Sequence, residues 1–142
     1  MSYKTVEVNK QTYVISKMNA IQQFHIARRL ATVYGAVYAS QGIISEGDYE
    51  KGFKALFSCL SSLSDEDSNF CLYGLLQCVS LKGKDGGNFP VMLDSTTPRN
   101  SEMRMMEMIA LAYHSLTFNV IDDFFLEEVK ALWSQIQDQI ST

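Results

Sequence analysis

The sequence is poor in the residues that hold metals or carry redox chemistry. It contains only two histidines, His25 and His114, and three cysteines, Cys59, Cys71 and Cys78. The histidines lack the i, i+4 spacing of a zinc-binding helix, and the cysteines form no Cys-x-x-Cys motif. An odd number of thiols within helical patterns is typical of reduced, buried cysteines. The sequence therefore predicts no metal site and no bound cofactor.

Recognisable enzyme motifs are also missing. The only glycine cluster, residues 83–87, lacks the Gly-Lys-Ser/Thr ending of a phosphate-binding loop. The clustered carboxylates lie at expected helix starts, where interaction with the helix dipole accounts for them. We therefore predict a protein that is not an enzyme. An unfamiliar active site around His25, Arg28 and Tyr34 is the alternative, and it would require these side chains to converge in a pocket.

Long apolar runs and an excess of basic residues are absent as well. No run approaches the roughly 18 apolar residues of a membrane span, and the first residues lack the apolar segment of a signal peptide. The net charge of −4 argues against nucleic-acid binding, so we expect a cytoplasmic protein that binds neither nucleic acid nor membranes. Residues 1–40 hold five basic and one acidic group, against seven and fifteen in the remainder. This asymmetry suits complementary protein surfaces, although a chance distribution accounts for it equally well.

Apolar residues at regular spacing make up much of what is present. The 142 residues are 46% apolar and 20% charged, which predicts one globular domain. Alternation in residues 1–16 predicts a β-hairpin that turns near Asn9-Lys10-Gln11. Residues 19–80 have the spacing of three helices, whose starts are expected at Asn19, Ser45 and Ser64.

The second half of the chain begins with an irregular stretch. Glycines and two prolines in residues 82–100 predict a loop, and a short strand or hairpin around Phe89–Leu93 fits the same residues. Residues 101–142 are expected to form the C-terminal helices. The predicted fold is therefore mostly α: a small bundle of about five helices with an N-terminal β-hairpin.

The last expected helix carries apolar residues on more than one side. Phe125 and Trp133 are nearly aligned, whereas Phe124 lies about 100° from that line. Since a small bundle buries one stripe per helix, these residues either fill the core or face a partner, and both interpretations fit. The methionine-rich residues 103–108 leave the same two alternatives.

Two segments resemble parts of the tail assembly chaperones of tailed bacteriophages and prophages. Residues 17–31, KMNAIQQFHIARRLA, resemble a helix reading roughly Gln-Phe-His-Val-Ala-Arg-Arg-Leu-Ala that follows a short hairpin in that family. Residues 119–125, NVIDDFF, resemble the family's Asn-Leu-x-x-Phe-Phe. Both keep their order and approximate distance, so the likeness spans most of the chain. Thr32 departs from the family, which often has proline at this point.

The resemblance implies a non-enzymatic protein that acts in the cytoplasm of the bacterial host and is not part of the mature virion. It would coat the tape measure protein, a long helical chain, and recruit tail tube subunits. Such a role also implies a homo-oligomer along the tape measure protein, and apolar grooves for an amphipathic helix. We expect six residues to bind partners: Phe24, Arg28, Arg29, Phe124, Phe125 and Trp133. For the two arginines, the alternative is that at least one is a solvated helix charge that pairs locally with a carboxylate.

A phage-encoded inhibitor of a host defence system, such as an anti-CRISPR protein, is the rival interpretation. Such proteins are also small, acidic and without catalytic residues. An inhibitor that imitates nucleic acid would spread its carboxylates over one face, whereas many carboxylates here gather at expected helix starts. The charge pattern therefore favours the chaperone.

Overall fold

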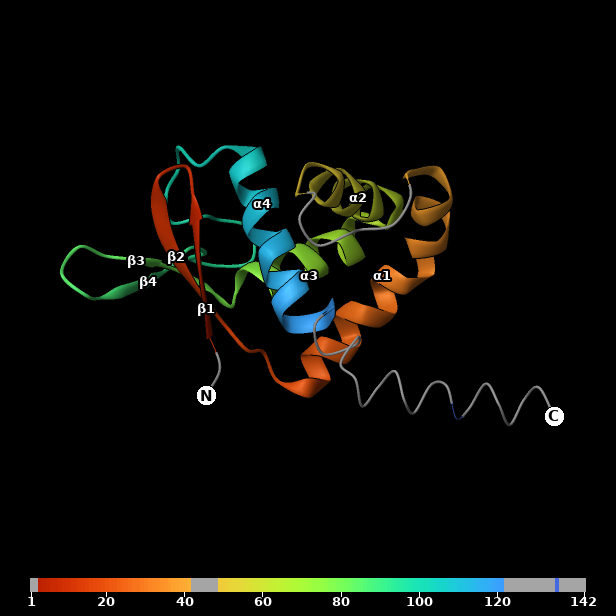
Figure 1. The fold of residues 1–142 in the computed structure, drawn as a ribbon, viewed down its shortest axis with the longest axis horizontal. Coiled ribbons are helices and arrows are strands. Elements are labelled where there is room, and N and C mark those ends of the chain that lie inside the picture. Colours follow the sequence, from red (N-terminus) through yellow and green to blue (C-terminus); the bar gives the residue numbers. More distant parts are fainter. Residues whose placement is uncertain (1–2, 42–48, 122–134, 136–142) are drawn as a thin grey trace.

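The computed structural model describes residues 3–41, 49–121 and 135. Figure 1 shows a sheet on one side, the helix α4 in the middle, and the helices α1 to α3 beyond it. Along the chain the elements are β1 (Tyr3–Val8), β2 (Gln11–Ser16), α1 (Ala20–Gln41), α2 (Tyr49–Ser62), α3 (Asp65–Leu76), β3 (Val79–Lys82), β4 (Asn88–Pro90), α4 (Met105–Leu116) and the π-helical turn η1 (Thr117–Ile121).

The prediction of a mostly α bundle of about five helices is wrong. The described residues form four helices and a four-stranded antiparallel sheet in the order β1-β2-β3-β4, which is a mixed α/β fold. The expected hairpin is present as β1 and β2, but β3 and β4 extend it into a full sheet. A hairpin alone is only marginally stable in water, so this extension gives the N-terminal strands a stable setting.

The error arises at the end of the third helix. Val79 was expected to continue that helix, yet α3 ends at Leu76 and Val79 pairs with Ile15 of β2. Both side chains are fully buried. A short apolar run is compatible with helix or strand, and pairing with a distant strand decided between them. β4 overlaps the short strand or hairpin that was expected around Phe89–Leu93.

The β1–β2 turn sets which face of the sheet is buried. Asn9 and Lys10 both have positive φ, 51° and 65°, as a two-residue type I′ turn requires. Val8 therefore pairs with Gln11, and Val6 pairs with Tyr13 two residues further on. Because residues directly opposite each other in a sheet point to the same face, Val6 and Tyr13 share a face and are buried beneath α4.

The helix α4 occupies the centre of the core. It contacts β1, α2 and α3, and its residues Ile109 to Tyr113 are all buried. Tyr113 lies so close to α2 that a Cβ at Gly52 would be 2.4 Å from its Cζ atom, so only glycine permits this approach. Met105 and Met106, at the start of α4, are exposed instead.

The helices α1 and α3 begin at the predicted caps. The Oδ1 atom of Asn19 accepts a hydrogen bond from the N–H of Gln22 at 2.9 Å. The Oγ atom of Ser64 accepts one from the N–H of Asp67 at 3.1 Å. Each bond satisfies a donor that the first turn of a helix would otherwise leave unpaired, which fixes where the helix starts.

Candidate functional site

An apolar ridge runs along the outer side of α1. Ile21 and Phe24 are 69% and 62% exposed, and Arg28 and Ala31 are exposed further along. The steps of three and four residues keep all four on one side of the helix. We call these four residues the α1 ridge. Large exposed apolar side chains in a cluster are typical of a surface that contacts another protein.

The ridge combines an aromatic ring with a cation one helical turn away. The ring of Phe24 meets the His25 imidazole edge-on, with centroids 5.4 Å apart. The Nε of Arg28 donates a hydrogen bond to the Nδ1 of His25 at 3.1 Å. His25 thus lies between the two and holds them in a defined arrangement on the surface.

Arg29, the next residue, points into the fold. Its Nε forms an ion pair with the Oδ1 of Asp67 at 3.0 Å, and its guanidinium stacks 3.9 Å from the centroid of the Phe70 ring. Its Nη1 also donates to the backbone oxygen of His25 at 3.1 Å. Arg29 therefore joins α1 to α3.

The other three expected partner-binding residues, Phe124, Phe125 and Trp133, lie outside the described residues. Phe24 and Arg28 are brought together on the α1 ridge, and Arg29 contacts α3 from the same helix. The proposed roles of all six in partner binding stay predictions.

The two segments that carry the family resemblance meet at Asn119, which is fully buried. Its Oδ1 accepts a hydrogen bond from the N–H of Met18 at 2.8 Å, and its Nδ2 donates to the backbone oxygen of Ser16 at 3.1 Å. Its own backbone oxygen accepts from the Nε2 of Gln23 at 2.7 Å. We call this set the Asn119 junction. These hydrogen bonds connect the start of α1 to η1, the turn that follows α4 about a hundred residues later.

Asn119 lies within the second segment of the resemblance, but the sequence alone indicates no role for it. A buried asparagine and a surface asparagine have the same sequence signal, because burial depends on which distant groups face the side chain. Only the recurrence of Asn in the family motif could have indicated it.

The thiol of Cys71 is fully buried. Burial raises the pKa of the Cys71 thiol to about 11, so the thiol stays protonated at neutral pH and is a poor nucleophile.

Within the described ranges, no three His, Cys, Asp or Glu side chains gather closely enough to hold a metal ion. None of the helices described has the length and apolar composition needed to cross a bilayer. Of the alternative active site, Arg28 is exposed and His25 is half-buried on α1, and the side chain of Tyr34 lies outside the described part of the chain.

Comparison with known protein families matches residues 9–132 to the family described as phage tail assembly chaperone protein, TAC. No curated protein and no solved structure matches the chain. The matched range includes the α1 ridge, the Asn119 junction and both segments that carry the resemblance. Because the match covers most of the sequence, this chain belongs to the phage tail assembly chaperone family.

Proposed function

We propose that this protein is a non-enzymatic chaperone that binds the tape measure protein and recruits tail tube subunits to it. It would act in the cytoplasm of the bacterial host and leave before the virion is complete. The observation that carries the proposal is the α1 ridge, an exposed apolar surface in a chain of this family. The family also favours this role over inhibition of a host defence system.

The ridge suits an amphipathic helix as its partner. Ile21 and Phe24 would cover the apolar stripe of that helix, since their spacing matches the repeat of a facing helix. Burying either side chain fully would contribute about 1.5–3 kcal/mol before the cost of association. Arg28 would pair with a carboxylate beside the stripe.

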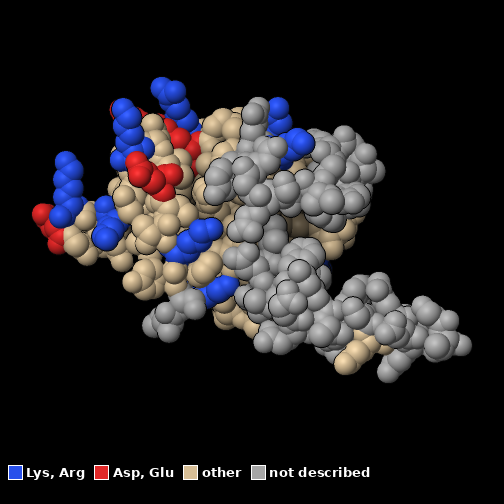
Figure 2. Space-filling view, in the orientation of Figure 1, with Lys and Arg blue, Asp and Glu red and all other residues tan. Residues whose placement is uncertain are grey.

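Several copies would line one long tape measure protein, so we also propose that the chain forms a homo-oligomer in that complex. The described face in Figure 2 shows acidic and basic side chains close to one another over the sheet side, without one large patch of a single sign. Self-association through this face would therefore depend on individual ion pairs. Light scattering of the purified chain, with and without the tape measure protein, measures the oligomer directly.

Replacing Phe24 by serine tests the proposal. We expect co-purification with the tagged tape measure protein from co-expressing cells to fall by at least about tenfold. The melting temperature should change little, because most of the Phe24 side chain is already in water. Phe57→Ser is the matched control, since Phe57 is 47% exposed on the different helix α2.

The two variants separate the possible outcomes. Retention of the tape measure protein by Phe57→Ser but not by Phe24→Ser would assign binding to the ridge. Equal retention by both would remove the ridge from the binding surface. Failure of the unaltered chain to retain the tape measure protein would overturn the proposed function itself. Purified tail tube protein added to the retained complex then tests recruitment.

A further inference from the structure

The strand β1 forms an open edge of the sheet. Among the described residues it pairs with β2 alone. Val8 and Gln11 close the two-residue turn as a hydrogen-bonded pair, and such pairs alternate along an antiparallel ladder. Val6 and Lys4 therefore bond to β2, whereas Thr5 and Glu7 direct their backbone N–H and C=O groups away from the sheet.

A groove of about 470 Å³ follows this edge. Its lining consists of Lys4, Thr5, Val6, Glu7, Val8, Phe53, Ala110 and His114. Five consecutive strand residues contribute, although their side chains alternate between the two faces of the sheet. The groove therefore runs along the backbone edge rather than over one face.

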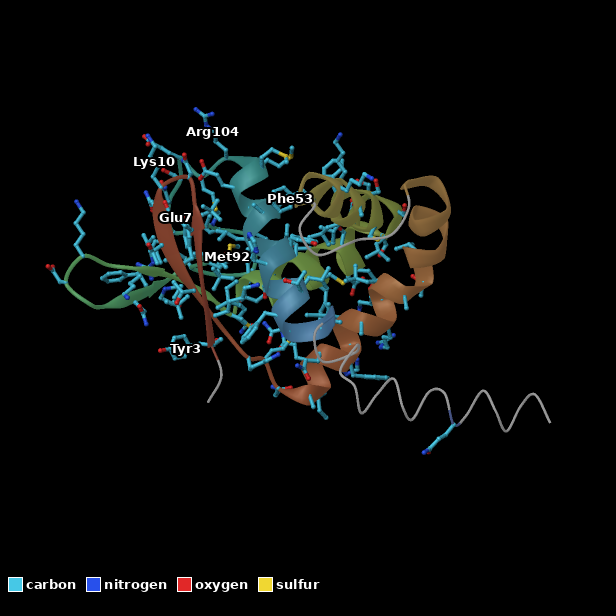
Figure 3. All side chains as sticks on the ribbon, in the orientation of Figure 1. Tyr3, Glu7, Lys10, Phe53, Met92 and Arg104 are labelled. Carbon is cyan, nitrogen blue, oxygen red and sulfur yellow. The ribbon has the colours of Figure 1, made fainter. Side chains whose placement is uncertain are left out.

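Helical side chains form the opposite wall. Ala110 and His114 come from α4, and Phe53 comes from α2. The ring of Phe53 meets the ring of Tyr113 on α4 edge-on, with the two centroids 5.3 Å apart. Figure 3 shows Phe53 on the helical side, with Glu7 toward the turn end of β1 and Tyr3 at the other end. Five strand residues span about 17 Å, so the groove has the length of a short strand.

We propose that this groove binds an extended segment of a partner protein, which adds a fifth strand to the sheet at β1. The open N–H and C=O groups of Thr5 and Glu7 match the spacing of a partner backbone that is extended, and a helix does not present its backbone groups in this way. The groove lies on β1 and not on α1, so the inference stands whichever tail protein binds the α1 ridge.

The side chains of the groove specify the composition of the segment. Lys4, Val6 and Val8 share the face that α4 covers, so they would meet every second residue of the added strand. Val6 and Val8 favour apolar residues there. Lys4 forms no ion pair within the described part of the chain, so it favours a carboxylate opposite. We infer a segment with two alternating apolar residues followed by an acidic one.

A synthetic heptapeptide provides the probe. The acetylated and amidated sequence Thr-Val-Thr-Val-Thr-Glu-Thr, added antiparallel to β1, places its two valines opposite Val8 and Val6 and its glutamate opposite Lys4. At about 1 mM peptide, we expect deuterium exchange at the amides of Thr5 and Glu7 in the ¹⁵N-labelled full chain to slow by at least about tenfold. The amide of Val6 should change little, because β2 already protects it.

Three controls show whether strand addition causes this protection. A peptide N-methylated on its three central threonine and valine residues loses edge hydrogen bonds and should give no protection. Lys4→Glu should weaken the peptide at least about fivefold and favour a version with lysine in place of glutamate. Thr5→Pro removes an outward N–H at a position where an edge strand tolerates proline, so it should abolish binding while the melting temperature is largely kept.

Two results would overturn the proposal. One is unchanged exchange at Thr5 and Glu7 with the peptide present, which would mean that Lys4 and Glu7 only guard the edge against pairing. The other is equal protection by the N-methylated peptide. Phe24→Ser should bind the heptapeptide like the unaltered chain, so a failure of the α1 ridge and a failure of the β1 groove are distinguishable.

Discussion

The α1 ridge and the Asn119 junction reverse the usual distribution of polar and apolar groups. On the ridge, Phe24 is 62% exposed, whereas at the junction the amide of Asn119 is 0% exposed. Exposed apolar patches and buried polar groups are the two deviations that carry most information about a fold. Here they lie on different sides of the same helix start, since Met18 and Gln23 bond to Asn119 from one side.

One short segment therefore has two separate roles. One side of the segment forms the hydrogen bonds with Asn119 that connect the hairpin and α1 to the turn after α4. The other side is exposed to solvent at Ile21 and Phe24. Arg28 and Arg29 show the same division, because neighbouring helical residues point about 100° apart. Arg28 lies on the ridge, and Arg29 forms an ion pair with Asp67. Substitutions on the two sides should therefore affect different measurements.

The largest effect is expected at the junction. Asn119→Leu keeps a similar volume but leaves the N–H of Met18 and the C=O of Ser16 without the side chain that now satisfies them. Buried polar groups without partners are costly, so we expect the free energy of unfolding to fall by about 2–4 kcal/mol. Chemical denaturation measures it.

Ser115→Ala is the control for the junction. It removes only the 3.3 Å bond between the Nδ2 of Asn119 and the Oγ of Ser115, so it should cost about 1 kcal/mol. If the folded fraction of Asn119→Leu still binds the tape measure protein normally, the junction is purely structural. A loss of stability no greater than that of Ser115→Ala would contradict the importance of the Asn119 bonds.

A medium effect is expected from the two arginines. Arg29→Ala removes the ion pair with Asp67, the contact with the Phe70 ring and a hydrogen bond to the His25 backbone oxygen. The free energy of unfolding should therefore fall by about 1–2 kcal/mol. Arg28→Ala should stay within about 0.5 kcal/mol of the unaltered chain, because Arg28 is exposed. Thermal unfolding of both variants checks the difference, and equal losses would contradict it.

Local signals predicted the N-terminal part of the fold well. The hairpin turn and the helix caps at Asn19 and Ser64 are all present, because each depends on a few neighbouring residues. The strand β3 was missed, since it forms only when Val79 meets Ile15 from β2. Such pairing between distant segments leaves no local mark in a single sequence.

The same distinction applies to the candidate site. Periodicity placed Phe24 on a helix, but it could not show which side of that helix the core would cover. The partner of Arg29, Asp67, is 38 residues away, so the pattern could not show which of the two adjacent arginines pairs with a carboxylate. The groove at β1 was not predicted either, because an edge exists only once the strand order is known.

The smallest effect is expected at His114, which is half-buried on α4. Burial, and secondarily the positive charge of Lys4, lowers the pKa of His114 below its usual 6.5. The unfolded chain therefore binds this proton more readily than the folded chain, and unfolding takes up protons as the pH falls below about 6.5. Well above that pH both states are neutral at His114, so this residue adds no pH dependence there.

We expect the unaltered chain to lose stability between pH 7 and pH 5.5, with a smaller change in melting temperature than Asn119→Leu produces. His114→Gln cannot take up the proton, so its melting temperature should vary less over this range. Melting curves at matched ionic strength measure both slopes. An unchanged slope in His114→Gln would show that the burial of His114 does not cause the loss of stability.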